Sequence, residues 1–294
     1  MNLKKSLRNA AFSSIATLGI AAFFVSPVLA ADMTELVLPS SLESNQMNAV
    51  TNGKWFFYND ETDQVVPTLG SFVMGPATAP LGAGSVQMSV TGSERKNIAT
   101  YRFKSTPLSD ITTLKFSTYN PSEGNGGSAN RSAYLQFNVS FNGSDTWQRR
   151  LTFVPKNNGS VLQNTWQEWD ALAGGTARWT YSGSVWPGTV IAGQTPRTWS
   201  EILAAYPSAK LRTTDSFMGF RVGEPYADGY TGQVDAFQFG TADGVTTFNF
   251  DPQVGPPTEK DTCKNEGWMT FNTPTFKNQG QCVKYVEMAL KATR

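Results

Sequence analysis

The stretch MGFRVGEPYADGYTGQVDAFQFG, residues 218–240, decides the fold. It predicts two strands joined by a long polar loop that carries two tyrosines. The second strand alternates polar with apolar residues from Gln233 to Phe239 and then meets Gly240, which is typical of a half-buried antiparallel strand. This alternation indicates a β-protein whose sheets bury one face.

Short predicted strands with turn residues between them continue along the chain. They cover residues 54–59, 85–90, 99–103, 113–119, 133–141 and 150–154. Runs rich in Asn, Gly, Pro and Asp separate several of them. One helix of about two turns is expected at residues 200–206, capped near Thr198 and stopped by Pro207. The order predicts an all-β, two-sheet antiparallel jelly-roll β-sandwich with one short helix.

Residues 1–30 have the pattern of a signal peptide. An apolar run follows three positive residues (Lys4, Lys5 and Arg8) and leads to a small-residue cleavage site that ends at Ala30. A membrane anchor needs about 20 uninterrupted apolar residues, and polar residues and Pro27 interrupt this run. Cleavage after Ala30 predicts a secreted, extracellular protein with no membrane insertion after the signal is removed.

The charge balance excludes two classes of partner. Removal of residues 1–30 leaves 21 Lys and Arg against 23 Asp and Glu, a net charge of −2. Nucleic-acid and anionic-membrane surfaces need clustered Lys and Arg, and the sequence shows no such cluster. We therefore expect no nucleic-acid partner.

The remaining chain divides by composition. Residues 31–48 form an N-terminal lead segment, 49–250 the sandwich, 251–260 a linker without apolar periodicity, and 261–294 a compact tail. The tail holds the two cysteines, Cys263 and Cys282, which predict one local disulfide in an exported protein. Apolar residues after Gly280 recur at helical spacing.

Two resemblances follow from these residues. The tail resembles a recurrent C-terminal motif of exported bacterial proteins, with C-K-N-x-G-W at residues 263–268 and F-K-N-Q-G-x-C-V at residues 276–283. The region from Trp55 to Phe250 resembles the jelly rolls of carbohydrate-binding modules and lectins, with T-W-Q-E-W-D at residues 165–170 similar to a strand of those sandwiches. The second resemblance implies a glycan-binding protein.

Catalytic groups are scarce. The chain has no histidine, which excludes Ser-His-Asp and Cys-His catalysis and His-ligated zinc. Glu168 and Asp170 would share one strand face, as a carboxylate pair for glycoside hydrolysis must. The denser E-x-D-x-x-E pattern of sandwich glycosidases is missing, and a solvated strand edge explains the same residues.

Aromatic side chains supply the first candidate ligand site. Five tryptophans fall within residues 166–199, and glycines place loops after the strand that contains Trp179. Exposed rings stack on the apolar face of a sugar. We expect sugar contacts from Trp179 and Trp186. The alternative is burial in the core, the usual position of large aromatic residues.

The loop at residues 221–230 supplies the second candidate ligand site. It carries Arg221, Glu224, Tyr226 and Tyr230, which would suit the hydroxyls and ring of a glycan. An ion pair between Arg221 and Glu224 that braces the loop explains two of these residues equally well.

A calcium ion is expected only by resemblance. In similar jelly rolls an acidic residue near the last strand, here Asp235, helps to hold a structural calcium. Oxygens from the first strand would complete the site, and Asp60 and Asp63 are candidates because calcium prefers hard oxygen ligands. A surface aspartate is the alternative.

Three classes of function remain. The first is a secreted, non-catalytic protein that binds a polysaccharide or cell-surface glycan, which accounts for the aromatic loops. The second is a structural surface or matrix protein without a small ligand. The third is a sandwich-fold glycoside hydrolase or polysaccharide lyase, which accounts only for the carboxylates and the Arg and Tyr clusters.

Overall fold

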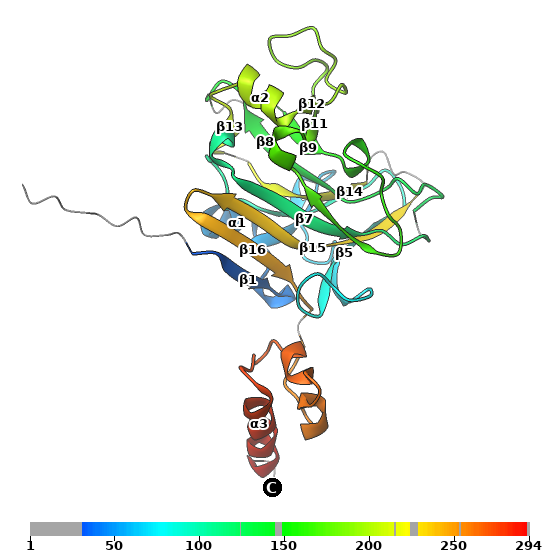
Figure 1. Ribbon diagram of the computed structural model, residues 1–294, viewed down its shortest axis with the longest axis vertical. Coiled ribbons are helices and arrows are strands. Elements are labelled where there is room, and N and C mark those ends of the chain that lie inside the picture. Colours follow the sequence, from blue (N-terminus) through cyan, green and yellow to red (C-terminus); the bar gives the residue numbers. More distant parts are fainter. Residues whose placement is uncertain are drawn as a thin grey trace, which may run out of the picture.

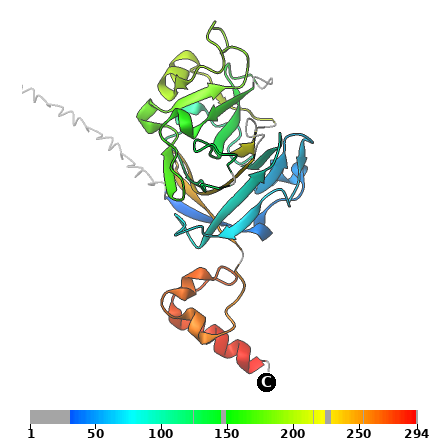
Figure 2. The ribbon, with the colours of Figure 1, turned by 90° about the vertical axis from the view of Figure 1, so that its right-hand side faces the viewer.

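The computed structural model describes residues 31–292 apart from 124, 145–148, 215, 224–228 and 253. The expected signal peptide, Glu224 and Tyr226 lie outside the described residues. Within the described part, two β-sheets pack face to face, and a small unit follows them at the C-terminus (Figures 1 and 2). The predicted fold class, an antiparallel jelly-roll sandwich with a disulfide-stapled tail, is confirmed.

The first sheet has seven strands in the part of the chain that is described, in the order β1-β16-β15-β5-β4, with β7 also beside β15 and β10 beside β7. Its strands are β1 (Met33–Val37), β4 (Ser71–Met74), β5 (Gly84–Val90), β7 (Thr113–Tyr119), β10 (Trp166–Asp170), β15 (Tyr230–Thr241) and β16 (Gly244–Phe250). Pairing is antiparallel except between β1 and β16, which run parallel. The lead segment therefore belongs to the sandwich, contrary to the boundary expected at residue 49.

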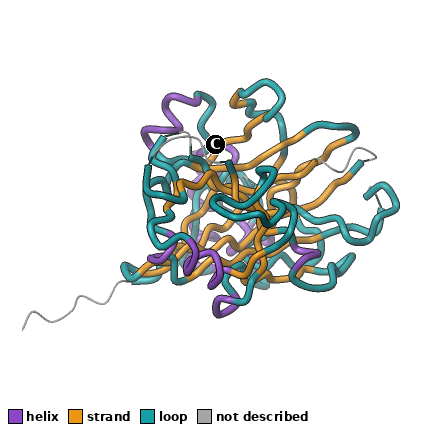
Figure 3. The backbone as a smooth tube through the Cα atoms, turned by 90° about the horizontal axis from the view of Figure 1, so that it is seen from above, coloured by secondary structure: helices purple, strands orange, loops and turns teal. Residues whose placement is uncertain are grey.

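The second sheet has nine described strands, in the order β12-β11-β9-β8-β14-β6-β2-β3, with β13 beside β8. They are β2 (Trp55–Asn59), β3 (Gln64–Val65), β6 (Arg95–Thr100), β8 (Tyr134–Ser140), β9 (Arg150–Phe153), β11 (Arg178–Tyr181), β12 (Arg197–Thr198), β13 (Lys210–Leu211) and β14 (Met218–Gly223). The strands occupy the middle of the molecule, and loops surround them (Figure 3).

Alternation along the strands builds the core. Leu135, Phe137 and Val139 of β8 point inward and are fully buried. Large rings from both sheets meet there: Trp55 of β2 lies edge-on to Phe248 of β16, with 5.3 Å between ring centroids. Burial of such rings supplies most of the favourable free energy of folding.

Three α-helices lie in the described residues, α1 (Gln46–Asn52), α2 (Trp199–Ala205) and α3 (Gln279–Ala292). The predicted capping of α2 is confirmed: the Thr198 hydroxyl accepts the Glu201 N–H at 3.2 Å, and the Glu201 carboxylate accepts the Thr198 N–H at 2.7 Å. This reciprocal pair satisfies N–H groups at the start of the helix. The helix follows β12 directly, and its first residue, Trp199, packs on Trp179 of β11 with 5.5 Å between ring centroids.

The tail is a separate small unit below the sandwich (Figure 1). The predicted disulfide between Cys263 and Cys282 is present. Both cysteines are buried with Phe276 and Val286 in a core that does not include sandwich residues. Asp251, expected in the linker, instead accepts the N–H groups of Ala83 and Gly84 at 2.8 and 2.7 Å and belongs to the sandwich. No helix in the described part is long and apolar enough to cross a membrane.

Candidate functional site

An aromatic hollow of about 530 Å³ opens where β8 ends, β9 begins and β11 ends. We define it by its lining residues: Phe141, Asn142, Arg149, Tyr181, Pro187, Gly188 and Tyr206. Its volume lies within the range of about 300–1,000 Å³ that small-ligand sites occupy. The hollow combines rings with polar groups at its margin, as sites for amphipathic ligands do.

The rings of the hollow hold one another in place. Phe141 lies 4.6 Å from Tyr206 and 5.5 Å from Tyr181, measured between ring centroids. The Tyr206 hydroxyl donates to the Pro187 carbonyl at 2.8 Å. Burial raises the pKa of both tyrosine hydroxyls above the ordinary value of 10. Both are therefore neutral near pH 7 and can donate and accept hydrogen bonds.

The loop at residues 184–193 forms one wall of the hollow. Val185 bridges Ala192, and the Gly193 N–H donates to the Ser184 carbonyl at 2.9 Å, so the loop is a small hairpin. Trp186 anchors it: its ring is fully buried, and its Nε1–H donates to the Thr195 carbonyl at 2.9 Å. The hairpin presents Pro187 and Gly188 to the hollow on a fixed backbone.

An arginine stacks against these anchoring rings. The Arg197 guanidinium lies 5.5 Å from the Trp186 ring centroid and 5.8 Å from that of Tyr206. The rings of Trp186 and Tyr206 are close to parallel, at 15°. Cation–π contacts of this kind stabilise partly buried rings. Trp186 therefore supports Tyr206, and of these two rings Tyr206 is the one that lines the hollow.

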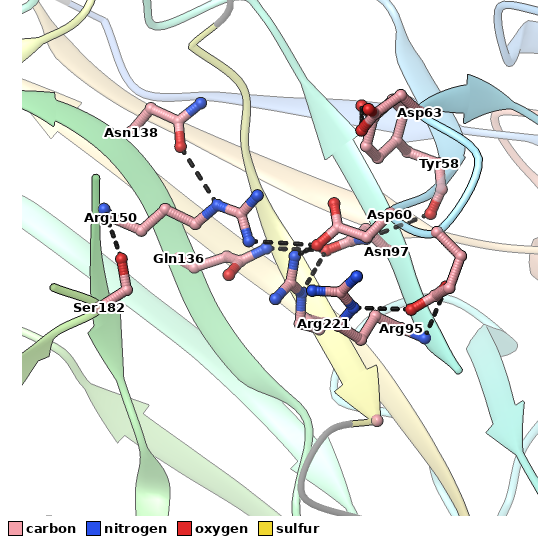
Figure 4. A network of polar contacts seen from close by, with 12 residues as sticks. Tyr58, Asp60, Asp63, Arg95, Asn97, Gln136, Asn138, Arg150, Ser182 and Arg221 are labelled. Atoms are coloured by element: carbon pink, nitrogen blue, oxygen red, sulfur yellow. Dashed lines mark hydrogen bonds and ion pairs between the residues drawn. The ribbon is translucent and has the colours of Figure 1, made fainter. Parts of the chain in front are cut away.

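A polar network covers the neighbouring outer face of the nine-stranded sheet (Figure 4). Asp60, which follows β2, is its centre and pairs with Arg221 of β14 and with Arg150 of β9, the latter at 3.1 Å. The Arg221 Nε–H also donates to Asn97 at 3.1 Å. Arg150 and Ser182 exchange hydrogen bonds of 2.9 and 3.1 Å, which brings the network to the edge of the hollow.

The centre of this network is closed to solvent. The Asp60 side chain is 2% exposed and that of Arg221 is 7% exposed, whereas Arg150 reaches 22%. Burial and the positive charge of Arg95 lower the pKa of Arg150 from its ordinary value. Because a buried carboxylate needs partners, Asp60 and its arginines serve to brace the five strands β2, β6, β14, β8 and β9.

The structure corrects the expected exposure of the predicted aromatic ligands. Trp179 and Trp186 are 0% exposed and Tyr230 is 1% exposed, so none of these rings is open to a sugar. Trp179 packs on Phe137 and donates to the Ala171 carbonyl at 2.9 Å. The Tyr230 hydroxyl donates to Asn120 at 2.6 Å. Trp179 enters the core from β11 and Tyr230 from β15, whereas Trp186 enters it from the hairpin at residues 184–193.

Arg221 is also placed differently from the expectation. It is buried and pairs with Asp60, which lies at the β2 end of the sheet. Glu224 and Tyr226 lie outside the described residues, and their expected contacts with a glycan stay predictions.

The three expected calcium ligands have separate partners. Asp235 is fully buried in β15 and accepts the N–H groups of Phe250 and Leu81 at 2.9 and 3.0 Å. Asp63 accepts the Tyr58 hydroxyl at 2.9 Å, and Asp60 holds its arginines. In the described residues no three Asp, Glu, Cys or His side chains gather in a group suited to a metal ion. Calcium binding stays a prediction.

The carboxylate pair of β10 is engaged in local contacts. Glu168 and Asp170 both face Lys115 of β7, with N–O distances of 3.4 and 3.9 Å. Asp170 also accepts the backbone N–H groups of Leu172 and Ala173 at 2.9 and 2.8 Å. These contacts account for both residues as part of a turn and a strand pair.

None of the residues that line the hollow is among the predicted ligand contacts, and three of them lie at the ends of elements: Phe141, Arg149 and Tyr206. Phe141 and Arg149 stand just outside the ends of β8 and β9, and Tyr206 follows the last residue of α2. Such positions at element ends carry binding residues more often than strand interiors do. That signal, applied to the predicted strand at 133–141, would have drawn attention to Phe141.

Comparisons with known proteins assign this chain to no family. No family model matches the chain, and no curated protein matches it. Among solved structures, TmCBM61 in complex with beta-1,4-galactotriose is similar at a TM-score of 0.30 and 13% sequence identity, over 64% of this chain and 88% of that chain.

Proposed function

We propose that the protein is a secreted, non-catalytic glycan-binding protein whose ligand site is the aromatic hollow. The observation that carries this proposal is the pairing of Tyr206 and Tyr181 with polar groups at one concave site. A pyranose has an apolar C–H face and hydroxyl edges, so it needs a ring to stack on and hydrogen-bonding groups beside it. The hollow offers both, and the disulfide in the tail supports an oxidising, extracellular location.

Binding to insoluble and soluble polysaccharides tests the proposal. Tyr206→Ala should weaken binding by about 1–3 kcal/mol, the cost of losing a ring from a ligand site. Tyr285→Ala is the matched control, because Tyr285 is a partly exposed tyrosine on the tail helix α3. Tyr206→Phe keeps the ring and removes only the hydroxyl with its bonds to Pro187 and Arg197, so it should retain most of the affinity.

The result also separates the competing classes. A well-folded wild type that binds no glycan in a broad panel would favour the structural surface or matrix protein. Release of reducing ends or unsaturated products would favour the hydrolase or lyase. Equal affinities of the Tyr206→Ala and Tyr285→Ala variants would show that a glycan binds somewhere other than the hollow.

A further inference from the structure

Among the described residues that line the hollow, Arg149 is the charged one. It lies directly before β9 and is exposed. In the described part of the chain its guanidinium forms no hydrogen bond or ion pair. Its neighbours differ: Arg150 is held by Asp60, and Arg95 is held by Glu61 at 2.6 Å. The network thus uses its arginines internally, while Arg149 lines the hollow.

The backbone of Arg149 is in a conformation that arginine rarely adopts. Its φ is 80°, in the left-handed region that favours glycine. Its carbonyl accepts the Val139 N–H at 3.2 Å, which ties this residue to β8. Unfavourable backbone angles persist where the surroundings fix them, and they cluster at ligand sites. The strain gives a second, independent reason to regard this position as functional.

The charge of the hollow has one sign. Among its described lining residues Arg149 is the ionised side chain, and none is Asp or Glu. Tyr181 and Tyr206 stay neutral near pH 7, as their raised pKa values require. The Arg197 guanidinium adds a second positive charge behind Tyr206. A negative ligand group at the mouth of the hollow would meet positive charge, and the described residues that line the hollow place no carboxylate against it.

We infer, on the basis of the proposed function, that the hollow takes an anionic sugar residue. Its carboxylate or sulfate group pairs with the Arg149 guanidinium while the sugar ring lies against the tyrosines. A planar guanidinium matches two oxygens of such a group and binds them through two parallel hydrogen bonds. Uronate and sulfated sugars share this chemistry, and two pairs of probes distinguish them.

Calorimetry with matched oligosaccharides tests the inference. The carboxylate arm compares oligogalacturonate with its methyl ester, and the sulfate arm compares a sulfated oligogalactan with its desulfated form. In one arm the wild type should bind the charged probe about tenfold or more tightly than the neutral one, the effect of one charge-assisted ion pair. Higher salt should reduce this ratio.

Substitution assigns the preference to Arg149. Arg149→Gln retains length and hydrogen bonding but no charge, so the ratio should fall to about one while neutral binding persists, because the rings remain. Arg149→Lys should restore part of the ratio. Arg178→Ala, at an exposed arginine of β11, is the control and should leave the ratio unchanged. Thermal melts confirm that each variant folds.

The outcomes separate two failures. Equal wild-type binding of charged and neutral probes in both arms would overturn the inference and leave glycan binding intact, as would an Arg149→Gln variant that keeps the wild-type ratio. A folded wild type that binds neither member of either pair, nor any other glycan, would overturn the proposed function and this inference together.

Discussion

Replacement of Asp60 by asparagine should destabilise the sandwich strongly. The Asp60 side chain is 2% exposed and faces two arginines, so the change removes the negative charge from a closed site and leaves the shape intact. Loss of one partner of a buried ion pair costs about 3–5 kcal/mol, because the remaining charge stays buried without compensation. For a domain of this size that corresponds to a fall in Tm of roughly 6–20 °C.

Urea unfolding of Asp60→Asn beside Glu61→Gln measures the effect. Glu61 is the matched control, since it pairs with Arg95 at the exposed rim of the same network with 36% of its side chain exposed. Exposed pairs contribute about 0–1 kcal/mol. Equal, small losses for the two variants would refute the reasoning. A second change, Arg221→Met, should recover part of the stability lost in Asp60→Asn, because it removes one uncompensated guanidinium.

Three further predictions concern a buried ring, a buried carboxyl group and the disulfide of the tail. Trp186→Ala should lower the free energy of unfolding in urea by about 3–5 kcal/mol. Val190→Ala, at a side chain 97% exposed on the same hairpin, should lower it by almost nothing. Similar values for the two variants would place Trp186 outside the core. Burial raises the pKa of Asp235 from 3.8 to about 7, so the folded state binds this proton more tightly than the unfolded state does. The stability that this group contributes is therefore full below about pH 4 and is lost as the pH rises to about 7. Asp235→Asn should remove that part of the pH profile, and an unchanged profile would contradict the assignment. Reduction of Cys263–Cys282 should lower the stability of the tail by about 3 kcal/mol, from the chain-entropy estimate, and expose the tail to proteolysis. The Tm of the sandwich should stay unchanged. A lower sandwich Tm would show that the two units depend on each other.

The strands were predictable where one face meets the core. Residues 113–119 alternate clearly, and β7 has those bounds. The strand expected at residues 99–103 lies at Arg95–Thr100 instead. Its first half reads as polar because Arg95 and Asn97 face the outer network, and their partners come from strands far away in the sequence. Periodicity alone cannot reveal a face that is buried and polar.

Helix α1 shows the same limit. It is mostly polar and buries one side chain, Ala49, so it has no apolar stripe to detect. Its ends are marked instead by local chemistry: the Asn45 side chain accepts the Met47 and Asn48 N–H groups, and Gly53 ends the helix at φ 66°. Both signals were available in the sequence.

The identity of the exposed rings was not predictable. A tryptophan ring offers a larger stacking area than a tyrosine ring. Trp179 and Trp186 are nevertheless buried, while Tyr206 lines the hollow. The difference depends on how α2 and the hairpin at 184–193 pack on β8 and β11. Those contacts join residues distant in the sequence, so only the folded chain determines which ring meets solvent.

The parallel pairing of β1 with β16 has a mechanical consequence. Met33 lies opposite Thr246 and Val37 lies opposite Phe250, so the chain enters at one end of this pair and leaves for the tail at the other. Tension between the N-terminal segment and the tail would therefore pull the two strands past each other along their length. All the hydrogen bonds between them would bear that load together, whereas a hairpin pulled from its open end loses its bonds one at a time. The same strand pair that closes the sheet edge makes the sandwich resistant to stretching between its ends.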